Sequence, residues 1–198
     1  MTMGSAVRLL GVIALAAAAT ACGGGGGGSS DGGTTGGPQT GSFVPADPTP
    51  PPNSVSLQAG THSGLVVNVN VAVTAVDDFF GTGFRIIYDP TVAQYQSFSS
   101  TGSFLRDPPF NASGQLDFRV DASTPGTLSI VATRLQNGQG NATGVDVAGT
   151  RTLLTLQFLM LKVSQTSPLT LPGSQREARD SQDTELPLTW QAGIFQVF

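Results

Sequence analysis

The chain from residue 53 onward alternates apolar and polar positions with a period of two. In the segment 65–75, apolar side chains occupy every second position, and Asn68, Asn70 and Thr74 share the opposite face. Such alternation is typical of a strand with one buried face and one polar face. Glycine, proline, asparagine and aspartate interrupt the pattern at short intervals, and no segment shows helical periodicity. The pattern therefore predicts an all-β domain over residues 53–198.

Four later segments continue the pattern: 84–90 (FRIIYDP), 116–120 (LDFRV), 127–134 (TLSIVATR) and 152–163 (TLLTLQFLMLKV). The last is apolar on both faces, so we expect it to lie centrally in its sheet. The final segments LPLTW and GIFQVF are joined by QAG. Because glycine permits the positive φ of a tight turn, they are expected to close the domain as a hairpin. About nine or ten short strands of this kind predict an antiparallel β-sandwich of two packed sheets.

The first residues of the chain have the features of a signal peptide. One basic residue precedes an apolar run too short to span a bilayer, and small residues lead up to Cys22. The segment Ala19–Cys22 resembles the lipobox of bacterial lipoproteins, although alanine stands where leucine is usual. The resemblance implies that residues 1–21 are removed and that Cys22 is lipidated and held at the cell envelope. Gly23 then favours the outer membrane of a Gram-negative cell; the alternative is an ordinary secretory signal cleaved near Ala21.

Residues 22–52 are expected to form a tether. They contain six consecutive glycines, then serine and threonine, and then the proline-rich run PADPTPPPN. The glycines satisfy the GxGxxG pattern trivially, but a phosphate-binding loop needs a strand before it and a helix after it, and the sequence predicts neither. The composition instead predicts a flexible segment that becomes stiffer toward its proline-rich end.

Charge and cysteine content narrow the possible functions. The formal net charge is −4, and the basic residues are spread singly, with Lys162 the one lysine. Nucleic acid is therefore not expected as a partner, because no basic stripe is available for phosphates. A single cysteine excludes an internal disulfide and any CxxC site for zinc or redox chemistry. No cofactor is expected.

The order of the predicted strands resembles the cohesin family. The matching pieces include GLVVNVNVAV, GFRIIYDPTVAQYQSF, GTLSIVATRLQNGQG, GTRTLLTLQFLMLKV and LPLTWQAGIFQVF, and the most specific are YDP at 88–90 and LLTLQF at 153–158. The resemblance covers about residues 54–198. It implies a nine-stranded jelly-roll sandwich related to carbohydrate-binding modules, which binds a dockerin module in cellulosomes and other cell-surface assemblies. Physically, YDP is explained as a turn that ends a strand.

One departure from the family concerns the expected contact surface. Dockerin-binding cohesins often carry asparagine and aspartate just before the aromatic residue of the strand that ends in YDP. Here those positions correspond to Gly81 and Gly83. This departure implies either that the domain contacts a protein partner through different side chains, or that it binds a ligand not found in cellulosomes.

Candidate catalytic and metal-binding residues are few. His62, the one histidine, lies in an expected turn, and Glu177 and Glu185 share one polar loop. Two acidic clusters, Asp77–Asp78 and Asp180 with Asp183, lack the spacing of an EF-hand. We expect solvated turns at all of these positions, no catalytic residues and no metal site.

Trp190 is the one candidate for ligand contact. As the single tryptophan it could stack on a sugar, or it could pack in the core. The sequence as a whole predicts a non-catalytic, lipid-anchored binding module with a protein partner. Two alternatives remain open: a carbohydrate-binding module linked to polysaccharide breakdown, and an accessory domain of a secretion or pilus apparatus.

Overall fold

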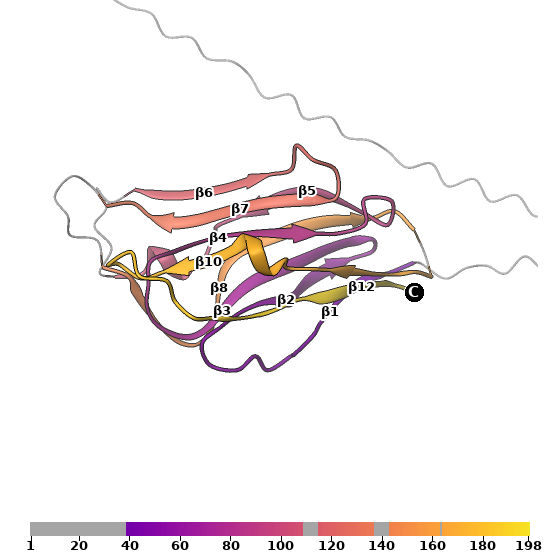
Figure 1. Cartoon of the computed structure of the whole chain (residues 1–198). Helices are drawn as coiled ribbons and strands as arrows, with labels where there is room; N and C mark the ends of the chain where they lie inside the picture. Colours follow the sequence, from indigo (N-terminus) through magenta and orange to yellow (C-terminus); the bar gives the residue numbers. More distant parts are fainter. Residues whose placement is uncertain (1–38, 109–114, 137–142, 163) are drawn as a thin grey trace, which may run out of the picture. The chain divides into compact units, whose positions relative to one another are not determined.

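The computed structural model describes residues 39–108, 115–136, 143–162 and 164–198 (Figure 1). These ranges contain twelve strands: β1 Gly41–Pro45, β2 Ser54–Ser63, β3 Val66–Phe79, β4 Gly81–Ile87, β5 Ala93–Ser99, β6 Leu116–Asp121, β7 Thr127–Arg134, β8 Val145–Met160, β9 Thr166–Leu169, β10 Arg176–Arg179, β11 Thr189–Gln191 and β12 Gly193–Val197. Two short 3-10 turns, η1 Phe104–Arg106 and η2 Gly173–Gln175, complete the elements. No helix in these ranges is long and apolar enough to cross a membrane. The all-β prediction is confirmed.

The strands form three sheets. A four-stranded sheet has the order β10-β4-β7-β6, a five-stranded sheet has the order β11-β2-β3-β8-β5, and a three-stranded sheet has the order β1-β12-β9. In Figure 1, strands β6, β7, β4 and β10 lie above β3, β2 and β1. The pairing of β11 with β2 is parallel and the other strand pairings of the described ranges are antiparallel. The predicted antiparallel sandwich is confirmed, with more strands than the nine expected.

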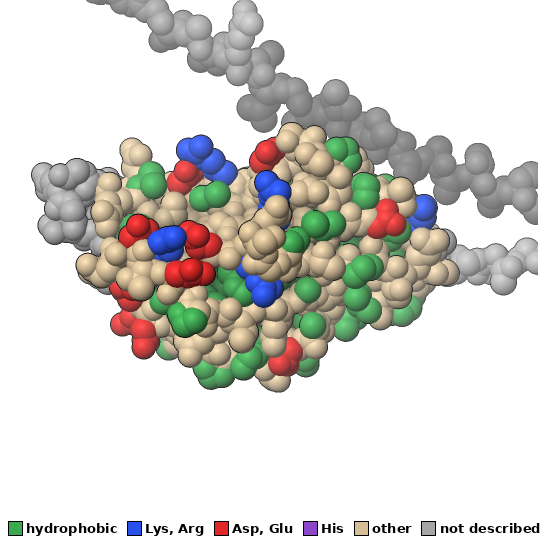
Figure 2. All heavy atoms as spheres, in the orientation of Figure 1, with side chains coloured by type: hydrophobic (Ala, Val, Ile, Leu, Met, Phe, Trp, Pro, Cys, Tyr) green, Lys and Arg blue, Asp and Glu red, His purple; other side chains and the backbone are tan. Residues whose placement is uncertain are grey.

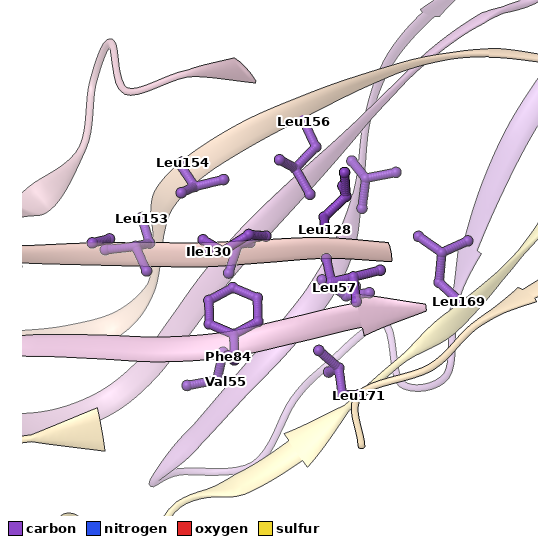
Figure 3. Close-up of a cluster of buried hydrophobic side chains, with 14 of the residues drawn as sticks. Val55, Leu57, Phe84, Leu128, Ile130, Leu153, Leu154, Leu156, Leu169 and Leu171 are labelled. Carbon is purple, nitrogen blue, oxygen red and sulfur yellow. The ribbon is translucent and has the colours of Figure 1, made fainter. Parts of the chain in front are cut away.

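The core lies between the two larger sheets, and Figure 3 shows part of it. The five-stranded sheet supplies the inward side chains Val67, Val69, Val71, Val73, Leu154, Leu156, Phe158 and Met160. The four-stranded sheet supplies Phe84, Ile86, Leu128, Ile130 and Ala132. Burying one such larger side chain contributes about 1.5–3 kcal/mol. The faces predicted from the alternation are therefore correct except at Thr74, which was expected on the polar face but is buried beyond a register shift after Val71 and hydrogen-bonded to Thr150. Strand β8 is an interior strand between β3 and β5.

The predicted C-terminal hairpin is wrong. Strand β11 pairs with β2, whereas β12 pairs with β1 and β9, so the chain changes sheet at Ala192. A Cβ atom at Gly193 would lie 2.3 Å from Cζ of Phe43. Gly193 is also absent from the residues with positive φ. The glycine is thus required for close packing on Phe43 and not for a turn.

The structure also moves the N-terminal boundary of the folded part. Strand β1 lies inside the range 22–52 that was expected to be tether, and it pairs with β12 along all five of its residues. Phe43 is 5% exposed, and its ring centroid lies 5.7 Å from that of Phe195. After β1, the proline-rich segment packs on β2, where Gln58 Nε2 donates to the Asp47 carbonyl at 2.9 Å. The sandwich therefore includes residues well before 53.

Candidate binding face

The outer face of the four-stranded sheet carries the most distinctive surface of the sandwich. On β4, Phe84 and Ile86 are buried in the core, so alternation turns Gly81 and Gly83 to the outer face, where Gly83 is half-buried and Gly81 is buried beside Thr133. Their partners on β7 are Thr133 and Val131. We call this surface the glycine face, formed by Gly81, Gly83, Val131 and Thr133 with Glu177, Arg179, Asp117 and Arg119 on either side.

Strand register arranges these residues in two parallel rows. The first row runs Arg179, Gly81, Thr133, Asp117 across β10, β4, β7 and β6. The second row runs Glu177, Gly83, Val131, Arg119 across the same strands. Each row has a charged residue at both ends and uncharged residues between them. The glycine face is therefore a neutral strip between two charged rims.

Ion pairs fix the charges at both rims. Arg179 Nε lies 2.6 Å from Glu177 Oε1, and Arg179 Nη1 lies 3.3 Å from Asp183 Oδ1. On the far rim, Arg119 Nε lies 2.8 Å from Asp117 Oδ1. The hydrogen bond from Arg179 lowers the pKa of Glu177 below its ordinary value and raises the pKa of Arg179. Figure 2 shows acidic and basic side chains gathered over β10 and over β6.

These exposed pairs contribute little to folding, about 0–1 kcal/mol each. Their consequence is electrostatic, because each rim presents a positive and a negative group side by side at neutral pH. A partner surface that places opposite charges against these rims gains orientation and association rate more than affinity.

A hollow of about 530 Å³ occupies the β10 side of the strip. A Cβ atom at Gly83 would have the Ile130 carbonyl oxygen, 4.0 Å away, as its nearest neighbour, so the surface above this residue is open. By contrast, a Cβ atom at Gly81 would lie 2.3 Å from Thr133 Oγ1. Val131 and Leu135 line the hollow and are 40% and 37% exposed. The arrangement can accept an apolar side chain between charged rims, as in the centre of a protein interface.

Arg134 supports one end of this face and was missed by the sequence reasoning. It is 3% exposed and donates hydrogen bonds to the carbonyl oxygens of Leu105, Asp107, Thr143 and Gly144. Burial lowers the pKa of its guanidinium, and nearby Asp107 opposes that shift. The signal was present in the sequence, because Arg134 continues the inward alternation of Leu128, Ile130 and Ala132.

Trp190 does not lie on the glycine face. Its ring is partly buried with its centroid 5.5 Å from that of Phe84, which points into the core. The Arg176 guanidinium carbon lies 5.8 Å from the centroid of the tryptophan ring, within the range of a cation–π contact. The structure thus places Trp190 at the edge of the core, on β11.

Among the other sequence candidates, Glu177 lies on strand β10 and not in the expected turn, and the rest lie at turns and near strand ends. Asp78 links two loops, because its Oδ1 accepts the Gly144 N–H at 2.7 Å and its Oδ2 accepts the Ser181 hydroxyl at 2.7 Å. Asp180 Oδ1 accepts the N–H groups of Gln182 and Thr184 within its own turn. His62 is exposed near the end of β2. Among the residues that the structure describes, no three acidic, histidine or cysteine side chains are arranged to hold a metal ion. Cys22 lies outside the described residues.

Comparisons with known proteins agree with this architecture. A family model for the Cohesin domain matches residues 54–189. The sixth cohesin from scaffoldin B of Acetivibrio cellulolyticus, solved in complex with a Cel5 dockerin variant, gives a TM-score of 0.55 at 18% identity and covers 73% of this chain and 97% of that chain. No curated protein matches the chain.

A second similar structure is CaCohA2 from Clostridium acetobutylicum. Its solution structure gives a TM-score of 0.53 at 23% identity and covers 72% of this chain and 88% of that chain. In a complex with a CaDoc0917 variant, CaCohA2 gives a TM-score of 0.54 at 20% identity and covers 70% of this chain and 95% of that chain. At these identities the likeness shows the fold.

Proposed function

The chain belongs to the cohesin family, and from this premise we propose that it binds a dockerin-type protein module through the glycine face. Domains of this family are non-catalytic interaction modules, and the similar cohesin of Acetivibrio cellulolyticus was solved with a dockerin bound. The proposed role is therefore attachment or assembly at the cell envelope without a chemical step.

The observation that carries the proposal is the neutral strip between two charged rims. The outer face of a four-stranded sheet suits the docking of another folded module, since specific interfaces bury about 800 Å² on each partner. The hollow above Gly83 and the exposed Val131 and Leu135 supply an apolar centre. Residues that anchor interfaces cluster in such central pockets.

The glycines define what the partner must look like. With no side chain at Gly81 or Gly83, the face offers no asparagine or aspartate side chain at these two positions. The partner must instead fill the hollow with a side chain of its own. We expect an apolar side chain on the partner, flanked by charged groups that meet Arg179 and Glu177 on one rim and Asp117 and Arg119 on the other.

A competition experiment tests this proposal. The full chain, immobilised on a surface, is used to capture proteins from the envelope fraction of the source cells, and captured proteins are identified by mass spectrometry. We expect a protein with a dockerin-like module to be retained by the unchanged chain and lost with Gly83→Leu. The matched control is Ser97→Leu on β5, which lies on the five-stranded sheet and should retain the partner. Equal retention by both variants would contradict the assignment of the face.

The location of the protein is a second part of the proposal. The lipobox-like segment at Ala19–Cys22 supports lipidation of Cys22 and anchoring at the envelope. Two or more acyl chains would give stable membrane attachment, where one alone is marginal. Growth with an alkyne-tagged palmitate should label the full chain but not its Cys22→Ala variant. Equal labelling of both would refute lipidation at this residue.

A further inference from the structure

A second hollow lies away from the glycine face. Its volume is about 360 Å³, and its lining residues come from the segment after β4, from β5, from the β6–β7 turn and from the residue after β8: Tyr88, Pro90, Ala93, Gln94, Tyr95, Ala122, Pro125 and Leu161. The sequence contains two tyrosines, and both line this one hollow. We call it the tyrosine pocket.

The walls of the tyrosine pocket are held rigidly. Both tyrosine rings pack edge-on against Phe158, with centroid distances of 5.4 Å for Tyr88 and 5.9 Å for Tyr95. The Tyr88 N–H donates to the Gly126 carbonyl at 2.9 Å. Gly126 has a φ of +79°, and a Cβ atom there would lie 2.8 Å from the Tyr88 carbonyl oxygen. The β6–β7 turn, which carries Pro125, is thereby pressed against the YDP segment.

The polar groups of the pocket are available to a ligand. Within the described part of the chain, neither tyrosine hydroxyl nor the Gln94 side chain has a hydrogen-bond partner, although Tyr88 is only 8% exposed. Burial, and then the neighbouring Tyr88, raise the pKa of Tyr95, so its hydroxyl stays neutral and can donate. Neither hydroxyl is among the buried polar atoms that lack a partner in the described residues, so both reach the surface of the pocket and can form hydrogen bonds with a ligand.

The lining also defines the class of ligand. None of the lining residues is charged, so the ligand is neutral. Pro90, Pro125 and Leu161 provide apolar walls, and two hydroxyls and one amide provide hydrogen bonds. A volume of about 360 Å³ is near the lower end for ligand sites and suits one ring-sized unit. A ligand with both C–H faces and hydroxyl edges matches this combination.

We propose that the tyrosine pocket binds one pyranose unit of a neutral polysaccharide. The two hydroxyls and the Gln94 amide would bond the sugar hydroxyls, and the prolines and Leu161 would contact its C–H face. A proline-rich peptide fits less well, because such peptides bind along grooves with successive aromatic-lined pockets. This proposal is independent of partner docking, since the glycine face shares no residue with the pocket.

Affinity electrophoresis of the full chain tests the proposal, in gels that contain barley β-glucan, xyloglucan, galactomannan or arabinoxylan, beside a microarray of neutral glycans. We expect retardation in at least one gel and binding to the corresponding glycans. Tyr95→Phe keeps the ring and removes one hydroxyl, so it should weaken binding roughly tenfold. The double variant of Tyr88→Phe with Tyr95→Phe should lose retardation.

Two control variants locate the site. Trp190→Phe and Gly83→Leu alter the other candidate positions and should bind glycan like the unchanged chain, and circular dichroism spectra should show that each variant is folded. The proposal is overturned if no neutral glycan binds, if folded Tyr95→Phe binds as tightly as the unchanged chain, or if Trp190→Phe abolishes binding. Binding of a decaproline peptide with no glycan bound would also overturn it.

Discussion

Replacing the two outward glycines of β4 one at a time should change stability in opposite directions. At Gly83, the nearest neighbour of a new Cβ atom is the Ile130 carbonyl oxygen at 4.0 Å, and the backbone needs no positive φ. Gly83→Ala should therefore stabilise the fold by about 0.5–1 kcal/mol, because a strand glycine loses more conformational entropy on folding than alanine. For a domain of this size, Tm should rise by about 2–4 °C per kcal/mol.

At Gly81 the same methyl group has no room. Its Cβ would lie 2.3 Å from Thr133 Oγ1, 2.6 Å from Thr133 Cβ and 3.1 Å from Thr133 Cα. Threonine is stiff at χ1, so the conflict must be relieved by moving the backbone of β7. Overpacking of this kind costs about 1–3 kcal/mol, and Gly81→Ala should lower Tm accordingly.

Thermal unfolding followed by circular dichroism compares the two variants directly. Binding is measured on the same proteins by surface plasmon resonance with the captured partner. Gly83→Leu, which fills the hollow, should weaken binding about 30-fold or more, the loss typical of a central interface position. Two results would refute the reasoning: equal destabilisation by both alanine variants, or unchanged partner affinity for a folded Gly83→Leu variant.

Three other predictions concern the sandwich itself. Arg134→Met should lower the free energy of unfolding by about 3 kcal/mol in urea titrations, because buried carbonyl groups lose their donors; a loss below about 1 kcal/mol would contradict this structural role of Arg134. Phe43→Ala should lower the free energy of unfolding by about 3–5 kcal/mol in the same titrations. An unchanged Tm after deletion of residues 1–45 would show that the fold does not need β1. The pKa values of Asp89 and Asp121 are lowered by hydrogen bonds with Thr91 and Ser123. The stability they add is present above about pH 4, the ordinary pKa of aspartate, and is lost as pH falls through the lowered values; a Tm that stays constant from about pH 5 to about pH 2 would contradict this.

The sequence predicted the faces of the long strands because each is specified locally. Val67, Val69 and Val71 alternate with polar residues along β3, and a period of two allows only one face to be buried. The same argument would have found Arg134, whose inward position follows from the alternation along β7. Fold class and core thus followed from pattern alone.

Strand partners could not be predicted in the same way. Strand β1 is five residues long and lies beside a proline-rich run, so nothing local distinguishes it from tether. Its place depends on β12, more than 140 positions away in the sequence. The prediction of a C-terminal hairpin was wrong for the same reason, because β11 and β12 pair with strands that are distant in the sequence.

Only part of the glycine face could be predicted from the sequence. The cohesin resemblance drew attention to Gly81 and Gly83 as a departure in side-chain chemistry. The charged rims come from β10 and β6, whose registers with β4 and β7 are long-range pairings. The hollow, and the different environments of the two glycines, follow from packing between strands, which no local pattern encodes.

The pairing of β1 with β12 has a mechanical consequence. If Cys22 is anchored in a membrane and the glycine face holds a partner, tension enters the sandwich at Gly41, the first residue of β1. Antiparallel hydrogen bonds run perpendicular to the strands, so a pull directed along β1 loads them together in shear, whereas a perpendicular pull breaks them one after another. The packing of Phe43 against Phe195 also resists displacement of β1 along its own axis. The direction of the applied force would therefore determine the rupture force of the sandwich.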